Sequence, residues 1–352
     1  MNRRHFLNST AAAVAYAALP VRPALPARRP MGVTVATYAV RWNSETQSAT
    51  YPALRTALDI LEDCARIGAG GAQVGVSNWE TDFAGKVRDR REQLGLYLEG
   101  QIRMPRVDED LDAFEQQVRL AREAGATILR AVCLGPRRYE TLHSMSEFLA
   151  FKEDAWKAVE RIEPIMRRNR VQLAIENHKD WRAEELVALM WHLGSEWMGV
   201  TLDMGNNIAL LEDPMTVVEQ LAPYAITTHF KDMAVAPYDA GFLLSEVPLG
   251  EGLLDLPRMV EICERHNPAI TFNLEMITRD PLKVPCMTEE YWSTFDYVGG
   301  RDLAWAFRYV SGNRPKQPLP TLSEKSPEGR LAYEDENNLR SFAYSRDVLG
   351  MK

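Results

Sequence analysis

Eight short apolar runs alternate with amphipathic stretches along this chain, and this alternation constrains the fold more than any other feature. The runs are 33–40, 72–76, 96–102, 127–134, 171–176, 199–203, 225–230 and 270–276. Strands that alternate with helices form parallel sheets with right-handed crossovers. Eight such units predict a closed α/β barrel, the (β/α)8 TIM barrel. An open doubly wound sheet is the alternative, but no glycine-rich dinucleotide motif follows the first run.

The segments between these runs carry helix signals. Residues 109–124 repeat apolar side chains at helical spacing, and Gly125 stands where a C-cap glycine belongs. Residues 52–67 and 145–169 are also predicted to be helical, and Pro214 fits a first helical turn. The connections between the strands are therefore those that a barrel needs.

The first thirty residues have the layout of an export signal. Arg3 and Arg4 precede Phe6 and Leu7, a short apolar stretch covers 11–19, and small residues and prolines follow. The arginine pair followed by Phe-Leu is typical of the twin-arginine kind, with an ordinary secretory signal as the alternative. The apolar stretch is too short to span a bilayer. We expect a periplasmic or secreted protein without a membrane anchor once the signal is removed.

The composition changes again near the C-terminus. From about Asn313 prolines interrupt any regular element, and polar residues dominate as far as Asn337. Residues 338–351 form an amphipathic pattern, which predicts a terminal helix that packs on the barrel or on a neighbouring subunit. We therefore divide the chain into a signal segment (1–30), a barrel (31–311) and a C-terminal extension (312–352).

Charge and cysteine content exclude several functions. The net charge of −8 disfavours binding to phosphate backbones, so no nucleic-acid partner is expected. No P-loop, nucleophile elbow or kinase motif is present. The chain has no CxxC pair, which excludes a zinc ribbon or thioredoxin motif. Buried free thiols are favoured over disulfides for most of the four cysteines, Cys64, Cys133, Cys263 and Cys286.

Four consecutive predicted strands end in a charged or imidazole side chain. These side chains are Glu176, Asp203, His229 and Glu275. In a TIM barrel the C-terminal ends of the strands meet at one rim, where catalytic sites lie. A single acid there is more often a helix cap or an ion-pair partner. Three carboxylates on one rim repel each other, and a shared Mn²⁺, Mg²⁺, Co²⁺ or Zn²⁺ removes that penalty. The sequence therefore predicts one divalent-metal site.

The segments that carry these residues have a family resemblance. IENH (175–178), LDMGNN (202–207), THFKD (228–232) and NLEM (273–276) resemble the xylose isomerase-like superfamily, and within it the sugar phosphate isomerase/epimerase group. The turn at 250–252 is also similar to that group. The resemblance covers roughly residues 31–311 and is specific in the last four strands. It implies that the four residues are the metal ligands, with Mn²⁺ preferred, and that the chain forms a homodimer or homotetramer.

The resemblance also implies a reaction. The usual chemistry of the group is proton transfer next to a carbonyl, with the metal stabilising an enediolate. By resemblance, Glu176 and Glu275 are the acid/base pair. We therefore expect an exported, metal-dependent isomerase or epimerase that acts on a small sugar or keto-sugar.

Two positions depart from the ketose 3-epimerase pattern. The histidine expected three residues after Asp203 is Asn206, and the arginine expected six residues after His229 is Val235. The order His-x-Lys-Asp at 229–232 looks more like inosose dehydratases. The same metal and bases would serve a lyase or dehydratase that eliminates a β-leaving group from a keto-sugar or 3-keto-glycoside.

Two further alternatives are disfavoured. An abasic-site endonuclease of the same superfamily needs more histidines than the six present. The intact glutamate pair argues against a non-catalytic sugar-binding barrel.

Five side chains near the rim are candidate substrate contacts: His178, Lys231, Asn206, Arg103 and Trp79. His178 binds substrate or orients Glu176. Lys231 neutralises an enediolate or carboxylate, or pairs with Asp232 or another acid. Asn206 contacts substrate or closes a turn with Asn207. Trp79 stacks on a sugar face or simply packs.

Overall fold

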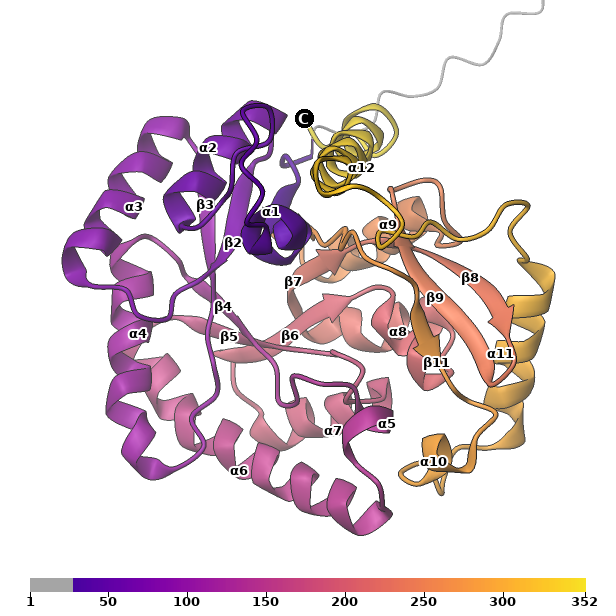
Figure 1. Ribbon diagram of the computed structural model, residues 1–352. Helices are drawn as coiled ribbons and strands as arrows, with labels where there is room; N and C mark the ends of the chain where they lie inside the picture. Colours follow the sequence, from indigo (N-terminus) through magenta and orange to yellow (C-terminus); the bar gives the residue numbers. More distant parts are fainter. Residues whose placement is uncertain (1–27) are drawn as a thin grey trace, which may run out of the picture.

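The computed structural model describes residues 28–352, so the expected signal segment, residues 1–30, lies almost wholly outside the described residues. Eight parallel strands close into a barrel in the order β1-β10-β7-β6-β5-β4-β3-β2 (Figure 1). Their bounds are β1 Gly32–Thr34, β2 Gly71–Gly75, β3 Tyr97–Gln101, β4 Ile128–Ala131, β5 Gln172–Glu176, β6 Met198–Asp203, β7 Ala225–Phe230 and β10 Thr271–Leu274. The predicted (β/α)8 barrel is confirmed.

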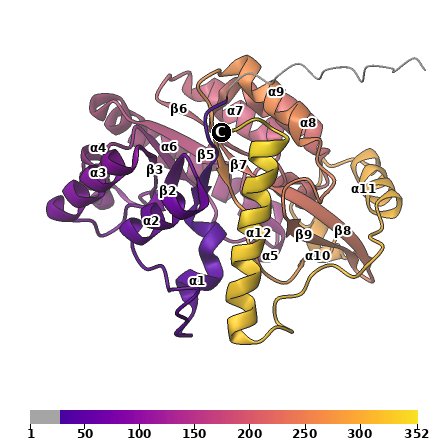
Figure 2. The same ribbon diagram turned by 90° about the horizontal axis from the view of Figure 1, so that it is seen from above.

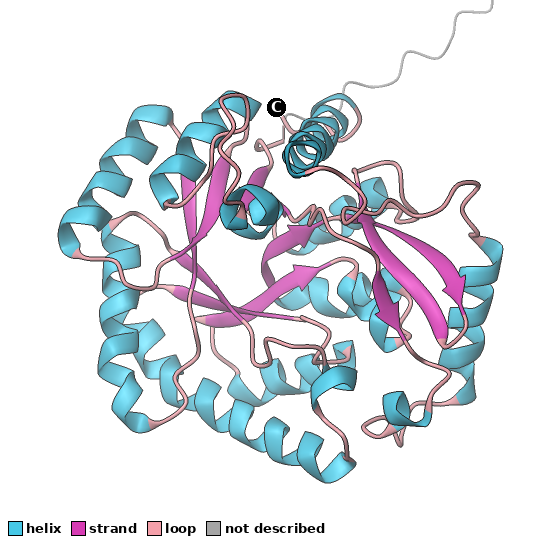
Figure 3. Ribbon diagram, viewed as in Figure 1, coloured by secondary structure: helices cyan, strands magenta, loops and turns pink. Residues whose placement is uncertain are grey.

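Helices surround the barrel, as Figure 3 shows, and pack apolar faces against the strands. They are α2 Ala57–Ile67, α3 Thr81–Leu94, α4 Leu111–Glu123, α6 Met145–Asn169, α7 Ala183–Leu193, α8 Pro214–Leu221 and α9 Leu256–His266. Local sequence sets their ends. Thr56 and Asp59 form a capping box at the start of α2, and Gly68, with a φ of 76°, ends it. The predicted helix at 145–169 and the first-turn proline of α8 are confirmed.

The first predicted strand, residues 33–40, is longer than the strand in the structure. β1 ends at Thr34, a 3-10 helix covers Val35–Tyr38, and α1 covers Ala39–Asn43. The first N–H groups of a helix have no partner within it. Glu334, near the other end of the chain, accepts hydrogen bonds from the N–H groups of Val40 (2.6 Å) and Arg41 (3.0 Å). This long-range cap stabilises a helix in a segment whose local pattern favours a strand.

A second sheet lies beside the barrel, and the sequence pattern did not predict it. Its antiparallel strands are β8 Asp232–Tyr238, β9 Gly241–Val247 and β11 Leu282–Val284, in the order β11-β9-β8. Helix α11 (Gly300–Gly312) packs along β8 on its outer side (Figure 1). Gly241, at a φ of 151°, begins β9 directly after the β8–β9 turn, and a Cβ there would lie 2.2 Å from the carbonyl oxygen of Val284. β8 follows β7 and β11 follows β10 in the chain, so this sheet is connected to the C-terminal ends of those two barrel strands.

The C-terminal extension contains a longer helix than predicted. Helix α12 covers Pro327–Asp347, so it begins inside the polar segment that was expected to be irregular. The Ser326 hydroxyl accepts a hydrogen bond from the Gly329 N–H, and Pro327 occupies the first turn. Figure 2 shows α12 along its length between the α1–α2 side of the barrel and the β8–β9 sheet. Several of its polar residues are buried, and one of them, Asn337, donates a hydrogen bond from Nδ2 to Thr278 Oγ1 at 3.0 Å.

The described chain begins with contacts to its own C-terminal end. Arg28, which the predicted boundary places in the signal, pairs with Glu264 at 2.8 Å and donates a hydrogen bond to the carbonyl oxygen of Leu349 at 2.7 Å. Within residues 28–352 no helix is both long and apolar enough to cross a membrane. All four cysteines are free thiols; Cys133 is half-buried and the others are buried.

Candidate metal centre and the cavity beside it

The barrel brings together the four side chains that the sequence predicted as ligands. Glu176 and Asp203 end β5 and β6, His229 lies in β7, and Glu275 directly follows β10. All four are buried, and one ligand atom from each lies within 4.8 Å of all the others. Asp203 and His229 are direct partners in the parallel ladder of β6 and β7. Strand register therefore sets the level at which the acid and the imidazole face each other.

The imidazole of His229 is oriented by a side chain from the opposite part of the barrel. Its Nε2 lies 2.8 Å from Gln73 Oε1. Gln73 Nε2 donates a hydrogen bond to Glu99 at 3.0 Å, and Gln101 Nε2 donates one to Gln73 Oε1 at 2.9 Å. Gln73 Oε1 is thus an acceptor, and His229 Nε2 must carry the proton. This leaves Nδ1 to face the carboxylates, the arrangement typical of a metal-ligating histidine.

Two buried polar atoms of the cluster lack a hydrogen-bond partner in the described part of the chain. His229 Nδ1 lies 3.0 Å from Glu275 Oε1 and 3.4 Å from Glu176 Oε2, but neither contact has hydrogen-bond geometry. The second atom is Asp203 Oδ2, which forms an ion pair with Lys231 Nζ at 2.7 Å but has no contact of hydrogen-bond geometry. Buried polar atoms are normally satisfied. An imidazole nitrogen and a carboxylate oxygen without hydrogen bonds, in a cluster of three carboxylates and one imidazole, fit a divalent cation with oxygen and nitrogen ligands.

Cationic side chains neutralise this cluster from two sides. Lys231 Nζ contacts Asp203 Oδ2 at 2.7 Å and also contacts Glu275, while Arg130 from β4 contacts Glu176. Lys231 is therefore paired with two of the predicted metal ligands and not with Asp232.

The same contacts shift the acidity of the ligands. Burial favours the neutral acid, but His229 and Lys231 hold the pKa of Glu275 well below its usual range. Despite burial, Arg130 and His229 likewise hold the pKa of Glu176 below its usual range. Burial raises the pKa of Asp203 to about 6, although Lys231 opposes this. Burial lowers the pKa of His229, but Glu275 and Glu176 overcome it and raise that pKa to about 9.

Asn206 links the metal cluster to two lysines. Its amide Nδ2 donates a hydrogen bond to Glu176 Oε1 at 3.1 Å, and its Oδ1 accepts from Lys179 and from Lys231. Asn206 is buried, so it orients Glu176 as well as closing the turn after β6. The neighbouring Asn207 is tied instead to Trp181 and Glu212.

The other three predicted substrate contacts are His178, Trp79 and Arg103. His178 is half-buried, burial lowers its pKa to about 4, and its Nδ1 has no hydrogen-bond partner among residues 28–352. Trp79 packs edge-on against Phe83 with ring centroids 5.5 Å apart, and it does not line the cavity described below. Arg103 is exposed and lines that cavity. Contact with substrate remains a prediction for all three.

The carboxylate of Asp232, the residue after Lys231, holds a backbone turn in place. It accepts hydrogen bonds from the backbone N–H groups of Gly250 (3.0 Å), Gly252 (2.9 Å) and Leu254 (3.1 Å). A Cβ on Gly252 would lie 2.2 Å from the Asp232 carboxylate, so only glycine fits. The turn that resembles the family is therefore pinned by an acid adjacent to the site.

Sequence patterns missed three polar residues of the centre. Arg130 and Gln73 lie inside apolar runs, and Lys179 has a φ of 69° just beyond β5. The available signal was the presence of a charged or amide side chain within a barrel strand, where inward-facing positions are usually apolar. Spacing alone does not tell which of these residues reach the rim.

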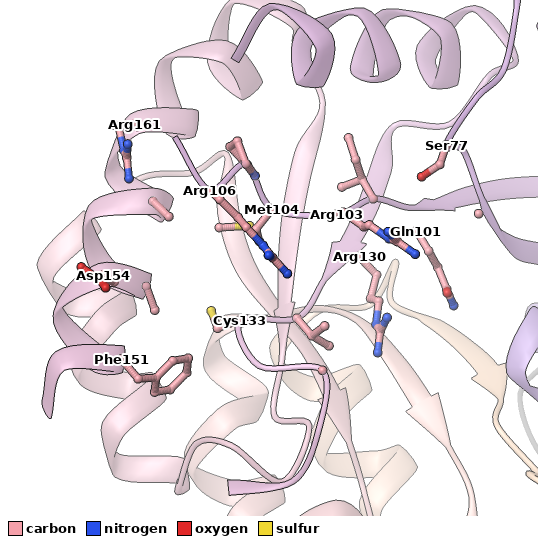
Figure 4. A pocket seen from close by; sticks show the side chains of 17 residues that line it. Ser77, Gln101, Arg103, Met104, Arg106, Arg130, Cys133, Phe151, Asp154 and Arg161 are labelled. Carbon is pink, nitrogen blue, oxygen red and sulfur yellow. The ribbon is translucent and has the colours of Figure 1, made fainter. Parts of the chain in front are cut away.

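A cavity of about 960 Å³ adjoins the metal cluster. It lies over the C-terminal ends of β2, β3 and β4, and α6 forms its outer wall. Gln101 and Arg130 line it and also contact Gln73 and Glu176 of the metal centre. Figure 4 places Gln101, Arg103 and Arg130 on one side, and Phe151, Asp154 and Arg161 on the other. None of the four ligand side chains lines the cavity, so Gln101 and Arg130 are the lining residues that connect it to the metal centre.

Comparison with known proteins adds an independent line of evidence. The family model described as xylose isomerase-like TIM barrel matches residues 61–293. A 3-oxo-isoapionate decarboxylase of Pectobacterium atrosepticum is 26% identical over 231 residues, which cover 64% of this chain and 78% of that protein.

Solved structures share the fold. A xylose isomerase-like TIM barrel protein from Mycobacterium smegmatis, in complex with magnesium, has a TM-score of 0.54 at 15% identity, covering 80% of this chain and 98% of that one. A D-psicose 3-epimerase solved in the presence of D-fructose has a TM-score of 0.57 at 14% identity, and the match covers 91% of this chain and 99% of that one.

Proposed function

This chain belongs to the xylose isomerase-like TIM barrel family, and from that premise we propose an exported, divalent-metal-dependent isomerase or epimerase of a small sugar or keto-sugar. The observation that carries the proposal is the convergence of Glu176, Asp203, His229 and Glu275 in one buried cluster. The magnesium complex of the Mycobacterium smegmatis protein supports a divalent cation, for which we propose Mn²⁺ first. Export is proposed from Arg3 and Arg4 of the leader, and a homodimer or homotetramer from the resemblance.

The four side chains would hold the cation through three carboxylates and His229 Nδ1. When bound, a divalent cation polarises a substrate carbonyl and makes the neighbouring C–H more acidic. The residues around it divide the remaining work. Lys231, held between Asp203 and Glu275, provides positive charge where negative charge develops on the substrate.

Glu176 and Glu275 are proposed as the proton carriers. The depressed pKa of each carboxyl keeps it ionised at neutral pH, which is the form a proton acceptor needs. One carboxylate would remove the proton from the carbon beside the carbonyl and thereby become a carboxylic acid. In an isomerisation the same carboxyl group would return that proton to the neighbouring carbon. In an epimerisation the other carboxylate would first take up a proton from solvent and then deliver it on the opposite face, while the first releases its proton to solvent. Asn206 Nδ2 holds Glu176 Oε1, and Arg130 holds the other oxygen, so the orientation of this carboxylate is defined.

A lyase is the second candidate, and two observations favour it. The Pectobacterium atrosepticum relative is named a decarboxylase, and loss of carbon dioxide beside a ketone needs the same stabilised negative charge. Val235, at the position of the epimerase arginine, is buried in the apolar core of the second sheet and cannot orient a substrate. Dehydration of a keto-sugar, or loss of the aglycone from a 3-keto-glycoside, would use the same residues.

The test is turnover by the metal-loaded protein with ketoses, sugar keto-acids and 3-keto-glycosides, followed by mass spectrometry. Unchanged mass identifies an isomerase, and loss of water, aglycone or carbon dioxide identifies a lyase. Glu275→Gln removes a proton carrier and is expected to lower kcat by about 100-fold or more. Glu261→Gln, an exposed glutamate on α9, is the matched control. Undiminished turnover by Glu275→Gln, or full activity of the metal-free protein, would contradict the proposal.

A further inference from the structure

The cavity beside the metal centre is basic, although the protein as a whole is acidic. Four arginines line it, Arg103, Arg106, Arg130 and Arg161, against a single acid, Asp154. The complete chain has 41 Lys and Arg against 49 Asp and Glu. The positive lining is therefore a local feature that the composition does not explain. A cleft lined by one sign of charge concentrates ligands of the opposite sign.

Two of these arginines are free of acidic partners in the structure. Arg161 pairs with Asp108 at 2.7 Å, and Arg130 contacts Glu176. Among residues 28–352, no carboxylate lies within 4.0 Å of the guanidinium of Arg103 or Arg106, and both side chains are exposed. They follow β3, the strand that also contributes Gln101 to the cavity and to the metal centre.

Cationic side chains also surround the metal centre that lies beside the cavity. The three ligand carboxylates are nearly balanced by a divalent cation. Lys231, Lys179 and Arg130 contact the ligands or Asn206, and Arg279 pairs with the buried Glu246. Of these four cationic side chains, Arg130 is the one that also lines the cavity. Buried cations need compensation, which a ligand can provide. Arg130 thus belongs both to the metal centre and to the cavity lining that carries the exposed Arg103 and Arg106.

We infer that the substrate is an anion, a keto-sugar that carries an acid group, and that Arg103 and Arg106 receive this group while the carbonyl end reaches the metal centre. A guanidinium binds a carboxylate or a phosphate through two parallel hydrogen bonds. The cavity of about 960 Å³ accommodates both ends of a sugar-sized ligand. This inference rests on the proposed function, because it places the carbonyl at the proposed metal centre.

The test compares charged and uncharged probes by calorimetry on the Mn²⁺-loaded protein. D-glucuronate is paired with its neutral isostere D-glucuronamide, and D-glucose 6-phosphate with D-glucose. We expect the acid of at least one pair to bind about tenfold or more tightly than its neutral partner, a difference of about 1.4 kcal/mol. A preference confined to glucuronate identifies a carboxylate as the acid group, and one confined to glucose 6-phosphate identifies a phosphate.

Variants test whether the tighter binding of the charged probes depends on Arg103 and Arg106. Arg103→Gln and Arg106→Gln are each expected to reduce it about tenfold, since each loses a charge-assisted pair of hydrogen bonds. Arg122→Gln, an exposed arginine on α4 outside the cavity, is the matched control and should retain the preference. Equal binding within both pairs, no binding of any probe, or full retention by both cavity variants would overturn the inference.

A separate Mn²⁺ titration distinguishes this inference from the proposed function. If Mn²⁺ binds but the charged probes have no advantage, the anion site is wrong and the metal centre stands. If Mn²⁺ does not bind while the arginine-dependent preference persists, the metal-dependent function is wrong and the anion site stands.

Discussion

His229 is the ligand whose chemistry depends most on a residue outside the cluster. The hydrogen bond between Nε2 and Gln73 Oε1 determines which ring nitrogen carries the proton and fixes the plane of the ring. Gln73 is itself held by Glu99 and Gln101 from β3. One half of the barrel thus orients a ligand that belongs to the other half.

At this scale, Gln73→Leu is expected to weaken Mn²⁺ binding about 10–100-fold, because the imidazole loses its orienting acceptor. Calorimetric titration of the purified variant with Mn²⁺ measures the change. Gln172→Leu is the control, since Gln172 is the first residue of β5 and its amide donates a hydrogen bond to the backbone carbonyl oxygen of Glu196. Wild-type affinity in Gln73→Leu would show that the hydrogen bond does not prepare His229 for the metal.

At the scale of elements, α12 fastens the N-terminal loops to the barrel. Glu334 caps α1, Asn337 donates a hydrogen bond to Thr278 after β10, and the Ser341 hydroxyl accepts one from the Leu249 N–H near the Asp232 turn. Three loops that are distant in sequence are therefore held by one helix. These contacts account for the burial of the polar residues Glu334, Asn337 and Ser341 of α12.

Two leucines of α12 provide a matched test of this role. Leu331 is 1% exposed and Leu339 is 44% exposed. Leu331→Ala is expected to lower the free energy of unfolding by about 2–5 kcal/mol, because it leaves a cavity at a fully buried position. Leu339→Ala should change it by no more than about 1 kcal/mol. Chemical denaturation monitored by circular dichroism measures both, and equal effects would mean that α12 does not contribute a packed face.

At the scale of the whole molecule, the metal ligands join half of the barrel. They come from β5, β6 and β7 and from the residue after β10, and these four strands are neighbours in the barrel order. A cation bound there connects them in the native state only. Metal binding and the stability of the barrel are therefore coupled.

Removal of the metal with a chelator is expected to lower the free energy of unfolding by about 2.7 kcal/mol when the loaded protein is measured at a metal concentration 100 times its Kd. In the metal-free protein the pKa of His229 is raised to about 9, above its ordinary value of 6.5. The stability from this protonation is complete below pH 6.5 and is lost as the pH rises through 9. Metal binding displaces the same proton, so affinity rises over that range.

The gap between the thermal unfolding midpoints of loaded and metal-free protein should consequently widen from pH 6.5 to 9. Calorimetric scans of both forms across this range measure it. A gap that stays constant or narrows would indicate that His229 Nδ1 does not exchange a proton for the metal.

The sequence alone determined the barrel and the composition of its rim. Strands and helices follow from hydrophobic periodicity and end signals, which act between residues a few positions apart. Because parallel strands of a barrel end at one rim, the order of Glu176, Asp203, His229 and Glu275 at four successive strand ends was enough to predict that they converge.

Tertiary structure alone decided the surroundings of those four residues. Gln73 lies 156 positions from His229, and Glu334 lies 294 positions from Val40, so no local pattern reports either contact. The helix at Ala39–Asn43 exists because α12 supplies a cap, and the second sheet because strands on both sides of β10 pair with each other. The basic cavity likewise arises where side chains from β2, β3, β4 and α6 meet. Periodicity determines which elements form, but only packing determines which of their polar side chains share a site.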